Sequence, residues 1–116
     1  MISIENEERS WGRFFVIHDQ PKYKLKRIEV DPGGRLSYQY HQKRSEAWTI
    51  VDGVGLITLN GVIKEHKAGE TILIPQGIKH RIENKKQEKV VFIEVQTGTY
   101  FGEDDIVRIE DDYNRV

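Results

Sequence analysis

The sequence contains no cysteine, and this absence narrows the chemistry open to it. Disulfide bonds and thiolate chemistry are excluded, and any metal ion has to be held by nitrogen and oxygen ligands. No apolar run approaches the length of a membrane-spanning helix. The first residues, MISIENEERSW, are acidic and lack the apolar stretch of a signal peptide. We therefore expect a cytoplasmic protein with no membrane partner.

A large excess of one charge is also missing. The chain has 18 basic and 19 acidic residues and a formal net charge of -1. A single-sign electrostatic field is therefore not expected, which argues against nucleic acid as a partner. The length of 116 residues predicts one domain spanning residues 1–116. Its apolar residues come in short clusters, which argues against disorder.

Turn-forming residues recur at the short intervals typical of an all-β sandwich or barrel. Asn60-Gly61 is the strongest hairpin signal, because a type I′ turn needs positive φ at both central positions. β-prone runs lie between the turns, at residues 14–17, 23–30, 47–51, 56–59, 71–74 and 90–95. Only the C-terminal run from Gly102 onward leaves a short helix or turn in competition with a strand. We expect a small antiparallel barrel, which disposes of exposed sheet edges.

The segment QYHQKRSE contains residue types that bind metals. If residues 35–41 form a strand, Arg35, Gln39 and His41 share one face, because strand side chains alternate. A hairpin into a strand over residues 46–51 would bring Glu46 beside them. Such nitrogen and oxygen donors suit a divalent ion. Spacing alone leaves ordinary polar surface open as an alternative.

A second histidine, His80, follows Pro75 and Gly77 at the expected start of another strand. Together with the first segment it would complete a set of two imidazoles, one carboxylate and one amide. The remaining histidines, His18 and His66, have no ligand-type neighbours at comparable spacing. We expect them to be surface or ordinary core residues.

Glycine and proline spacing supplies a more specific signal. The first half reads Gly33-(5)-Gln39-x-His41-(4)-Glu46-(6)-Gly53, and the second reads Gly69-(5)-Pro75-x-Gly77-(2)-His80-(3)-Asn84. These patterns resemble the two motifs of the cupin superfamily, G-(5)-HxH-(3,4)-E-(6)-G and G-(5)-PxG-(2)-H-(3)-N. The one departure is Gln39, which stands where the first histidine is expected. The resemblance implies a small antiparallel cupin barrel, also called a double-stranded β-helix or jelly roll.

A closer resemblance covers residues 8–116. Glu8-Arg9-Ser10-Trp11-Gly12-Arg13 and the run Gly98–Arg108 are similar to the C-terminal isomerase domain of bifunctional mannose-1-phosphate guanylyltransferase/mannose-6-phosphate isomerases, the type II enzymes. This resemblance implies a divalent metal, with zinc first and manganese, cobalt, iron or nickel as alternatives. The implied metal ligands are Gln39, His41, Glu46 and His80. Two features depart from the family: Gln42 and Lys43 replace frequent histidines, and no GxGxRLxPLT loop for guanylyl transfer is present.

The same resemblance implies interconversion of mannose 6-phosphate and fructose 6-phosphate through an enediol. The expected partner is a small sugar phosphate, for which cationic side chains are needed. Candidate phosphate-binding residues are Arg13, Lys24, Lys26, Arg81 and Arg108, and Arg35 is a catalytic candidate from its strand face. The proton-shuttling base stays open between Glu94, Glu46 and a metal-bound hydroxide. Other metal-dependent cupin enzymes, acting on free sugars or as oxygenases, and a non-catalytic sugar-binding or sensing cupin are the alternatives.

The apolar, β-prone segment WGRFFVI, Trp11 to Ile17, predicts a homodimer. Such a strand near a terminus commonly pairs with the sheet edge of another copy, and twofold dimers are the commonest assembly. The alternative is that it folds back onto its own sheet. The two tryptophans, Trp11 and Trp48, suit either a sugar pocket or core packing.

Overall fold

The computed structural model describes residues 5–111, which form a succession of β-strands. The strands are β1 (Glu5–Arg9), β2 (Gly12–Asp19), β3 (Tyr23–Val30), β4 (Tyr38–Tyr40), β5 (Arg44–Asp52), β6 (Val54–Leu59), β7 (Val62–Lys67), β8 (Thr71–Ile74), β9 (His80–Glu83), β10 (Val90–Gly98) and β11 (Val107–Glu110). Within this part of the chain no helix is long and apolar enough to cross a membrane.

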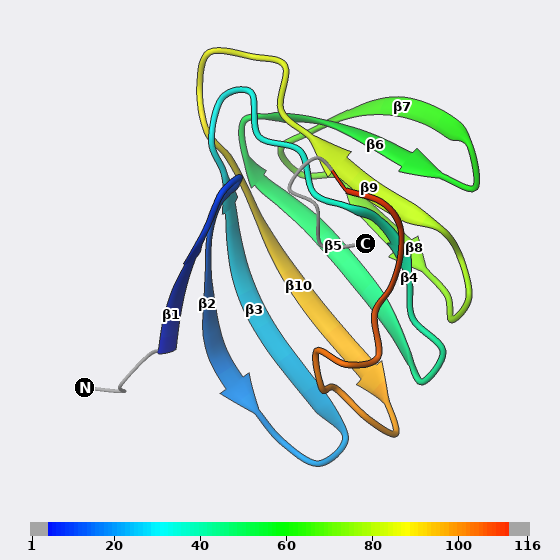
Figure 1. Cartoon of the computed structure of the whole chain (residues 1–116). Coiled ribbons are helices and arrows are strands. Elements are labelled where there is room, and N and C mark those ends of the chain that lie inside the picture. The colour runs from blue at the N-terminus through cyan, green and yellow to red at the C-terminus, as the bar shows by residue number, and fades with distance from the viewer. Residues whose placement is uncertain (1–4, 112–116) are drawn as a thin grey trace.

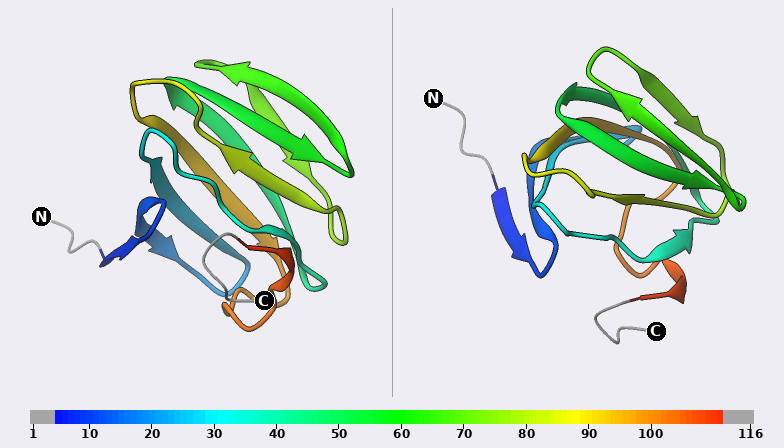
Figure 2. Two further views of the ribbon diagram at one scale, coloured as in Figure 1. Left: turned by 45° about the horizontal axis from the view of Figure 1, so that its top comes forward. Right: turned by 90° about the horizontal axis from the view of Figure 1, so that it is seen from above.

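The strands form two antiparallel sheets that face each other (Figures 1 and 2). The six-stranded sheet has the order β1-β2-β3-β10-β5-β8, and the five-stranded sheet has the order β11-β4-β9-β6-β7. Viewed from above, the two sheets enclose the interior from opposite sides (Figure 2). This architecture confirms the predicted antiparallel all-β fold.

The interior of the sandwich is apolar at one end and polar at the other, and β5 shows why. Its inward-facing residues alternate strictly, as expected for a half-buried strand. Trp48 and Ile50 belong to the apolar core, which also contains Ile57, Ile82 and Phe92. Glu46 and Arg44, which precede Trp48 by two and four positions on the same face, are also buried. One face of β5 therefore contributes residues both to the apolar core and to the polar end of the interior.

The predicted turn at Asn60-Gly61 is confirmed. Asn60 has a φ of 44° and Gly61 a φ of 82°, and they join β6 to β7 as a hairpin. Gly53 is required for a different reason. It has a φ of 81°, and an added Cβ would lie 2.4 Å from the backbone oxygen of Lys89. The glycine therefore allows β5 to turn into β6 directly beside the backbone that leads into β10.

The expected strand over residues 35–41 is only partly formed. Leu36 and Ser37 are both buried, so the alternation of faces breaks there, and β4 is limited to Tyr38–Tyr40. The predicted hairpin to the next strand is wrong, because β4 and β5 lie in different sheets. The chain instead crosses from the five-stranded to the six-stranded sheet between them. Residues on either side of this crossing face the same interior.

The N-terminal segment folds back onto its own sheet. Strand β2 pairs with β1 on one side and with β3 on the other, and Trp11 and Phe14 are buried. Its backbone is therefore not the free edge that the dimer prediction assumed, because β1 takes that place (Figure 1). The homodimer itself stays a prediction.

The C-terminal run forms a strand rather than a helix. Strand β11 pairs with β4, and the loop that precedes it crosses one end of the sandwich. Asp105 in this loop is buried, and its carboxylate accepts hydrogen bonds from the backbone nitrogens of Gln42 and Lys43. The loop thereby fixes the crossing between β4 and β5. The last residues of the run, 112–116, lie outside the described residues.

Candidate metal centre

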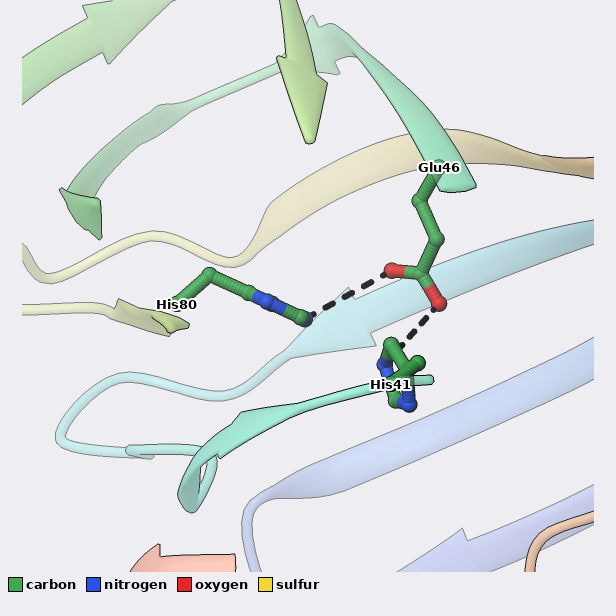
Figure 3. Close-up of side chains that lie close together, drawn as sticks. All are labelled: His41, Glu46 and His80. Carbon is green, nitrogen blue, oxygen red and sulfur yellow. Dashed lines mark ion pairs between the residues drawn. The ribbon is translucent and has the colours of Figure 1, made fainter. Parts of the chain in front are cut away.

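Three of the predicted ligands, His41, Glu46 and His80, lie together inside the polar end of the sandwich (Figure 3). His41 follows β4, Glu46 lies on β5 and His80 begins β9. Their candidate ligand atoms lie within 4.8 Å of one another, and all three side chains are buried. Residues that are far apart in the sequence thus form one compact group.

Both imidazole rings are oriented by the backbone. The Nδ1 of His41 is 2.8 Å from the carbonyl oxygen of Asp105, and that of His80 is 2.9 Å from the carbonyl oxygen of Ile78. A carbonyl oxygen can only accept, so each Nδ1 carries the proton and donates. The Nε2 atoms are left to face Glu46. Metal-binding histidines are commonly held in this way.

The donor distances fit a bound ion. The Nε2 of His41 is 3.2 Å from Glu46 Oε2, and the Nε2 of His80 is 3.7 Å from Glu46 Oε1. Ligands that each lie about 2.0–2.2 Å from a zinc ion are separated by distances of this order. Gln39 is the cross-strand partner of His80, and its amide nitrogen, rather than its oxygen, bonds to Ser37 Oγ. The group therefore suits a divalent cation with nitrogen and oxygen ligands.

The electrostatics favour the protonation states that bind metals. Burial alone would raise the pKa of Glu46, but the neighbouring His41, His80 and Arg44 hold that pKa well below its usual range. Burial lowers the pKa of His80 despite the opposing charge of Glu46. The carboxylate is thus ionised and His80 tends to be neutral, as metal ligation requires. A carboxylate so strongly held in its charged form is a weak proton acceptor.

A second buried carboxylate, Glu94, lies beside the group on β10. The indole N–H of Trp48 lies 3.0 Å from Glu94 Oε2 and 3.0 Å from Glu46 Oε1, so one donor bridges the two acids. The amide nitrogen of Gln96 donates to the other Glu94 oxygen. Burial, and next the charge of Glu46, raise the pKa of Glu94 to about 7, against the opposing charges of Lys26 and Arg44. Glu94 can therefore exchange a proton near neutral pH.

A cavity of about 120 Å³ is lined by His41, Glu46, His80 and Glu94. Of the sequence-predicted site residues, the lining includes Lys26, Gln39, His41, Glu46, His80, Glu94 and Arg108. Trp11 and Trp48 also line it, while belonging to the apolar core. Glu94 therefore faces the interior beside the three predicted ligands. The cavity brings metal-type ligands, a titratable acid and cations into one space.

Four of the predicted cationic residues do not line this cavity: Arg13, Lys24, Arg35 and Arg81. Arg35 does not share the face of Gln39 and His41, because the strand alternation breaks at Leu36 and Ser37. Its guanidinium instead lies 3.6 Å from Glu110. This corrects the expectation that placed Arg35 on the site face.

The other three cations are engaged outside the cavity. Arg81 donates to the carbonyl oxygen of Leu36 and to Glu110. Arg13 lies 3.6 Å from Glu8, and Lys24 lies 3.9 Å from Asp19. The geometry therefore supports only Lys26 and Arg108 from the predicted phosphate-binding set.

Sequence reasoning missed Arg44, Gln96 and Glu103, which all contact site residues. The signal for the first two was available, because Arg44 precedes Glu46 by two positions and Gln96 follows Glu94 by two, so strand alternation places them on the same faces. Glu103 lies in the loop before β11, where its carboxylate reaches Lys26 at 3.1 Å. No sequence pattern predicts where a loop side chain of this kind points.

Comparison with known families gives one match over most of the chain. The family model described as mannose-6-phosphate isomerase C-terminal matches residues 3–111. A mannose-1-phosphate guanylyltransferase of Salmonella montevideo is 44% identical over 107 residues, which are 92% of this chain and 23% of that protein. The xanthan biosynthesis protein XanB of Xanthomonas campestris pv. campestris (strain B100) is 40% identical over 108 residues, which are 93% of this chain and 23% of that protein. The chain thus spans less than a quarter of the length of these relatives.

Solved structures give the same fold at lower identity. A Klebsiella pneumoniae protein with a double-stranded β-helix domain matches with a TM-score of 0.73 and 21% identity, covering 83% of this chain and 82% of that one. The capsular polysaccharide assembling protein CapF of Staphylococcus aureus matches with a TM-score of 0.81 and 23% identity, covering 95% of this chain and 35% of that one. The double-stranded β-helix, or cupin, fold expected from the glycine-spaced motifs is thereby confirmed.

Proposed function

This chain belongs to the mannose-6-phosphate isomerase C-terminal family, and from that premise we propose that it is a metal-dependent isomerase of mannose 6-phosphate and fructose 6-phosphate. The observation that carries the proposal is the buried group of His41, Glu46 and His80 beside Glu94 in one cavity. A fold alone does not give a function, whereas these side chains supply metal-type ligands and a titratable acid. The names of the relatives support a mannose phosphate as the substrate class.

The metal centre is the first part of the proposal. His41, Glu46 and His80 would hold the ion, with Gln39 as the fourth ligand and zinc as the first choice. A bound ion would supply Lewis acidity to the sugar oxygens at the reacting carbons. The protein's part is to keep the two Nε2 atoms and the carboxylate converged through the bonds to Asp105 and Ile78. Because the rings are already held in place, less side-chain entropy is lost when the ion binds.

Glu94 is the proposed base that moves the proton between C1 and C2. Aldose–ketose isomerisation removes a proton from one carbon and returns it to the neighbouring one, and a group with a pKa near the working pH does this best. The pKa of Glu94 is raised to about 7, whereas that of Glu46 is held well below its usual range. The two neighbouring carboxylates thus suit different tasks, proton transfer for Glu94 and ligation for Glu46.

Lys26 and Arg108 are the proposed contacts for the phosphate. Lys26 is nearly fully buried, and its ammonium lies 4.3 Å from the centre of the Phe14 ring and 3.1 Å from Glu103 Oε1. The charge and hydrogen bond of Lys26 hold the pKa of Glu103 below its usual value, although burial opposes this. A phosphate would compete with the Glu103 carboxylate for Lys26 because both are anionic oxygen acceptors.

A coupled assay with mannose 6-phosphate tests the proposal. We expect fructose 6-phosphate to form after loading with Zn²⁺, Mn²⁺ or Co²⁺, and formation to stop on chelation. Free mannose should react more slowly than the phosphorylated sugar, since it lacks the group for Lys26. Turnover of free sugars alone would favour another cupin isomerase. Metal binding with no turnover of either sugar would favour a sugar-binding or sensing cupin.

A further inference from the structure

A buried cation lies inside the ligand group itself. Arg44 is 4% exposed, its Nε lies 2.8 Å from Glu46 Oε2, and its Nη2 lies 3.3 Å from His41 Nε2. Its Nη1 is buried and has no hydrogen-bond partner within residues 5–111. The guanidinium thus contacts two of the proposed metal ligands while one of its own donors is unsatisfied. Burying a donor without a partner costs free energy, so little stability is lost when the guanidinium moves away from this position.

The contact with His41 limits what else that ring can bind. The Nδ1 of His41 faces the carbonyl oxygen of Asp105, and a guanidinium can only donate, so Nε2 accepts from Arg44 Nη2 through its single lone pair. The N–H of Arg44 Nη2 points its proton at that lone pair. A metal ion would need the same lone pair. The guanidinium and the ion therefore cannot both bind His41.

We propose that Arg44 is an internal competitor for the metal centre, so that an ion must displace its Nη2 from His41 before it binds. This inference rests on the proposed metal function of His41, Glu46 and His80. The cost of displacement belongs to the protein and is the same for every ion. Arg44 therefore lowers the affinity for all divalent ions by one common factor. Weakly bound ions are excluded first, and Mn²⁺ stands at the weak end of the usual affinity order for nitrogen and oxygen sites.

The test is a metal titration of the wild type and of Arg44→Leu. Calorimetry or competition with a chelator measures the affinity of each protein for the ion. Leucine offers neither a positive charge nor a ligand atom. Breaking a hydrogen bond to a charged group and removing a nearby like charge should tighten metal binding by roughly tenfold to a hundredfold. The factor should be similar for Zn²⁺, Co²⁺ and Mn²⁺. The matched control is Arg81→Leu, because Arg81 is also buried but does not line the cavity, and its metal affinity should equal that of the wild type.

Arg44→Gln is the second variant, for the case in which leucine beside Glu46 prevents folding. It is checked by circular dichroism before titration and should also tighten binding. Metal affinity that is unchanged or weaker in the folded Arg44 variants would overturn the proposal and leave Arg44 as a support for Glu46. If neither the wild type nor the variants bind metal, the proposed metal centre fails and this inference falls with it.

Discussion

Replacing His41 or His80 with alanine is expected to weaken zinc binding by a factor of about one hundred to one thousand. Zinc sites with four protein ligands bind with about 10–16 kcal/mol in total, so an equal share for one ligand is about 2.5–4 kcal/mol. Both rings are buried and held by backbone carbonyls, so no solvent-exposed side chain can easily replace them. Competition with a chromophoric chelator measures the affinity of each variant.

His66→Ala is the matched control for this experiment. His66 lies on β7, its Nδ1 is 3.6 Å from Glu70, and it does not line the site cavity. Its removal should leave zinc binding as in the wild type. Equal zinc affinity in His80→Ala and in the wild type would show that the ion binds elsewhere, and the proposed centre would then be wrong.

Replacing Glu94 with glutamine is expected to lower the isomerase kcat by about a hundredfold to ten-thousandfold, the range found for general acid–base groups. Glutamine keeps the shape and can still accept from Trp48, but it cannot take a proton. Metal affinity should change little, because Glu94 is not a proposed ligand. Glu83→Gln, on β9 and outside the cavity lining, is the control and should retain wild-type turnover.

The proposed role of Glu94 also predicts the direction in which activity changes with pH. A base must be deprotonated to act, and the pKa of Glu94 is raised to about 7, chiefly by burial. Wild-type kcat/KM should therefore rise as the pH increases through about 7 and level off above it. The residual activity of Glu94→Gln should lack this rise. If Glu94→Gln keeps the wild-type rate and profile, another group moves the proton.

The glycine-spaced motifs carried most of what the sequence could predict. They place His41, Glu46 and His80 at strand ends that open on one interior, and the structure brings these three together. The prediction succeeds because positive-φ glycines fix where strands turn, as Gly53 does beside Lys89. Spacing of this kind is a backbone property and can be recognised without knowing any contact.

The predictions that failed depend on contacts between distant segments. The proximity of β4 and β5 in the sequence predicts a hairpin, but Asp105, more than sixty positions later, fixes a crossing there instead. The prediction that Arg35 faces the site relies on side chains alternating between the two strand faces. Two consecutive buried residues, Leu36 and Ser37, interrupt that alternation. A basic residue in a charged segment is usually solvated, so the sequence does not single out Arg44, whereas the β5 pattern buries it against Glu46.

The most direct test of the proposed isomerase activity is the reaction of the metal-loaded protein with mannose 6-phosphate in D₂O, monitored by proton NMR. We expect fructose 6-phosphate to form and deuterium to enter the sugar at C1 or C2, because a base that exchanges its proton with solvent carries out the transfer. Both conversion and deuterium entry should disappear on chelation. If protein shown to hold its metal leaves mannose 6-phosphate unconverted, the chain is not a mannose-6-phosphate isomerase.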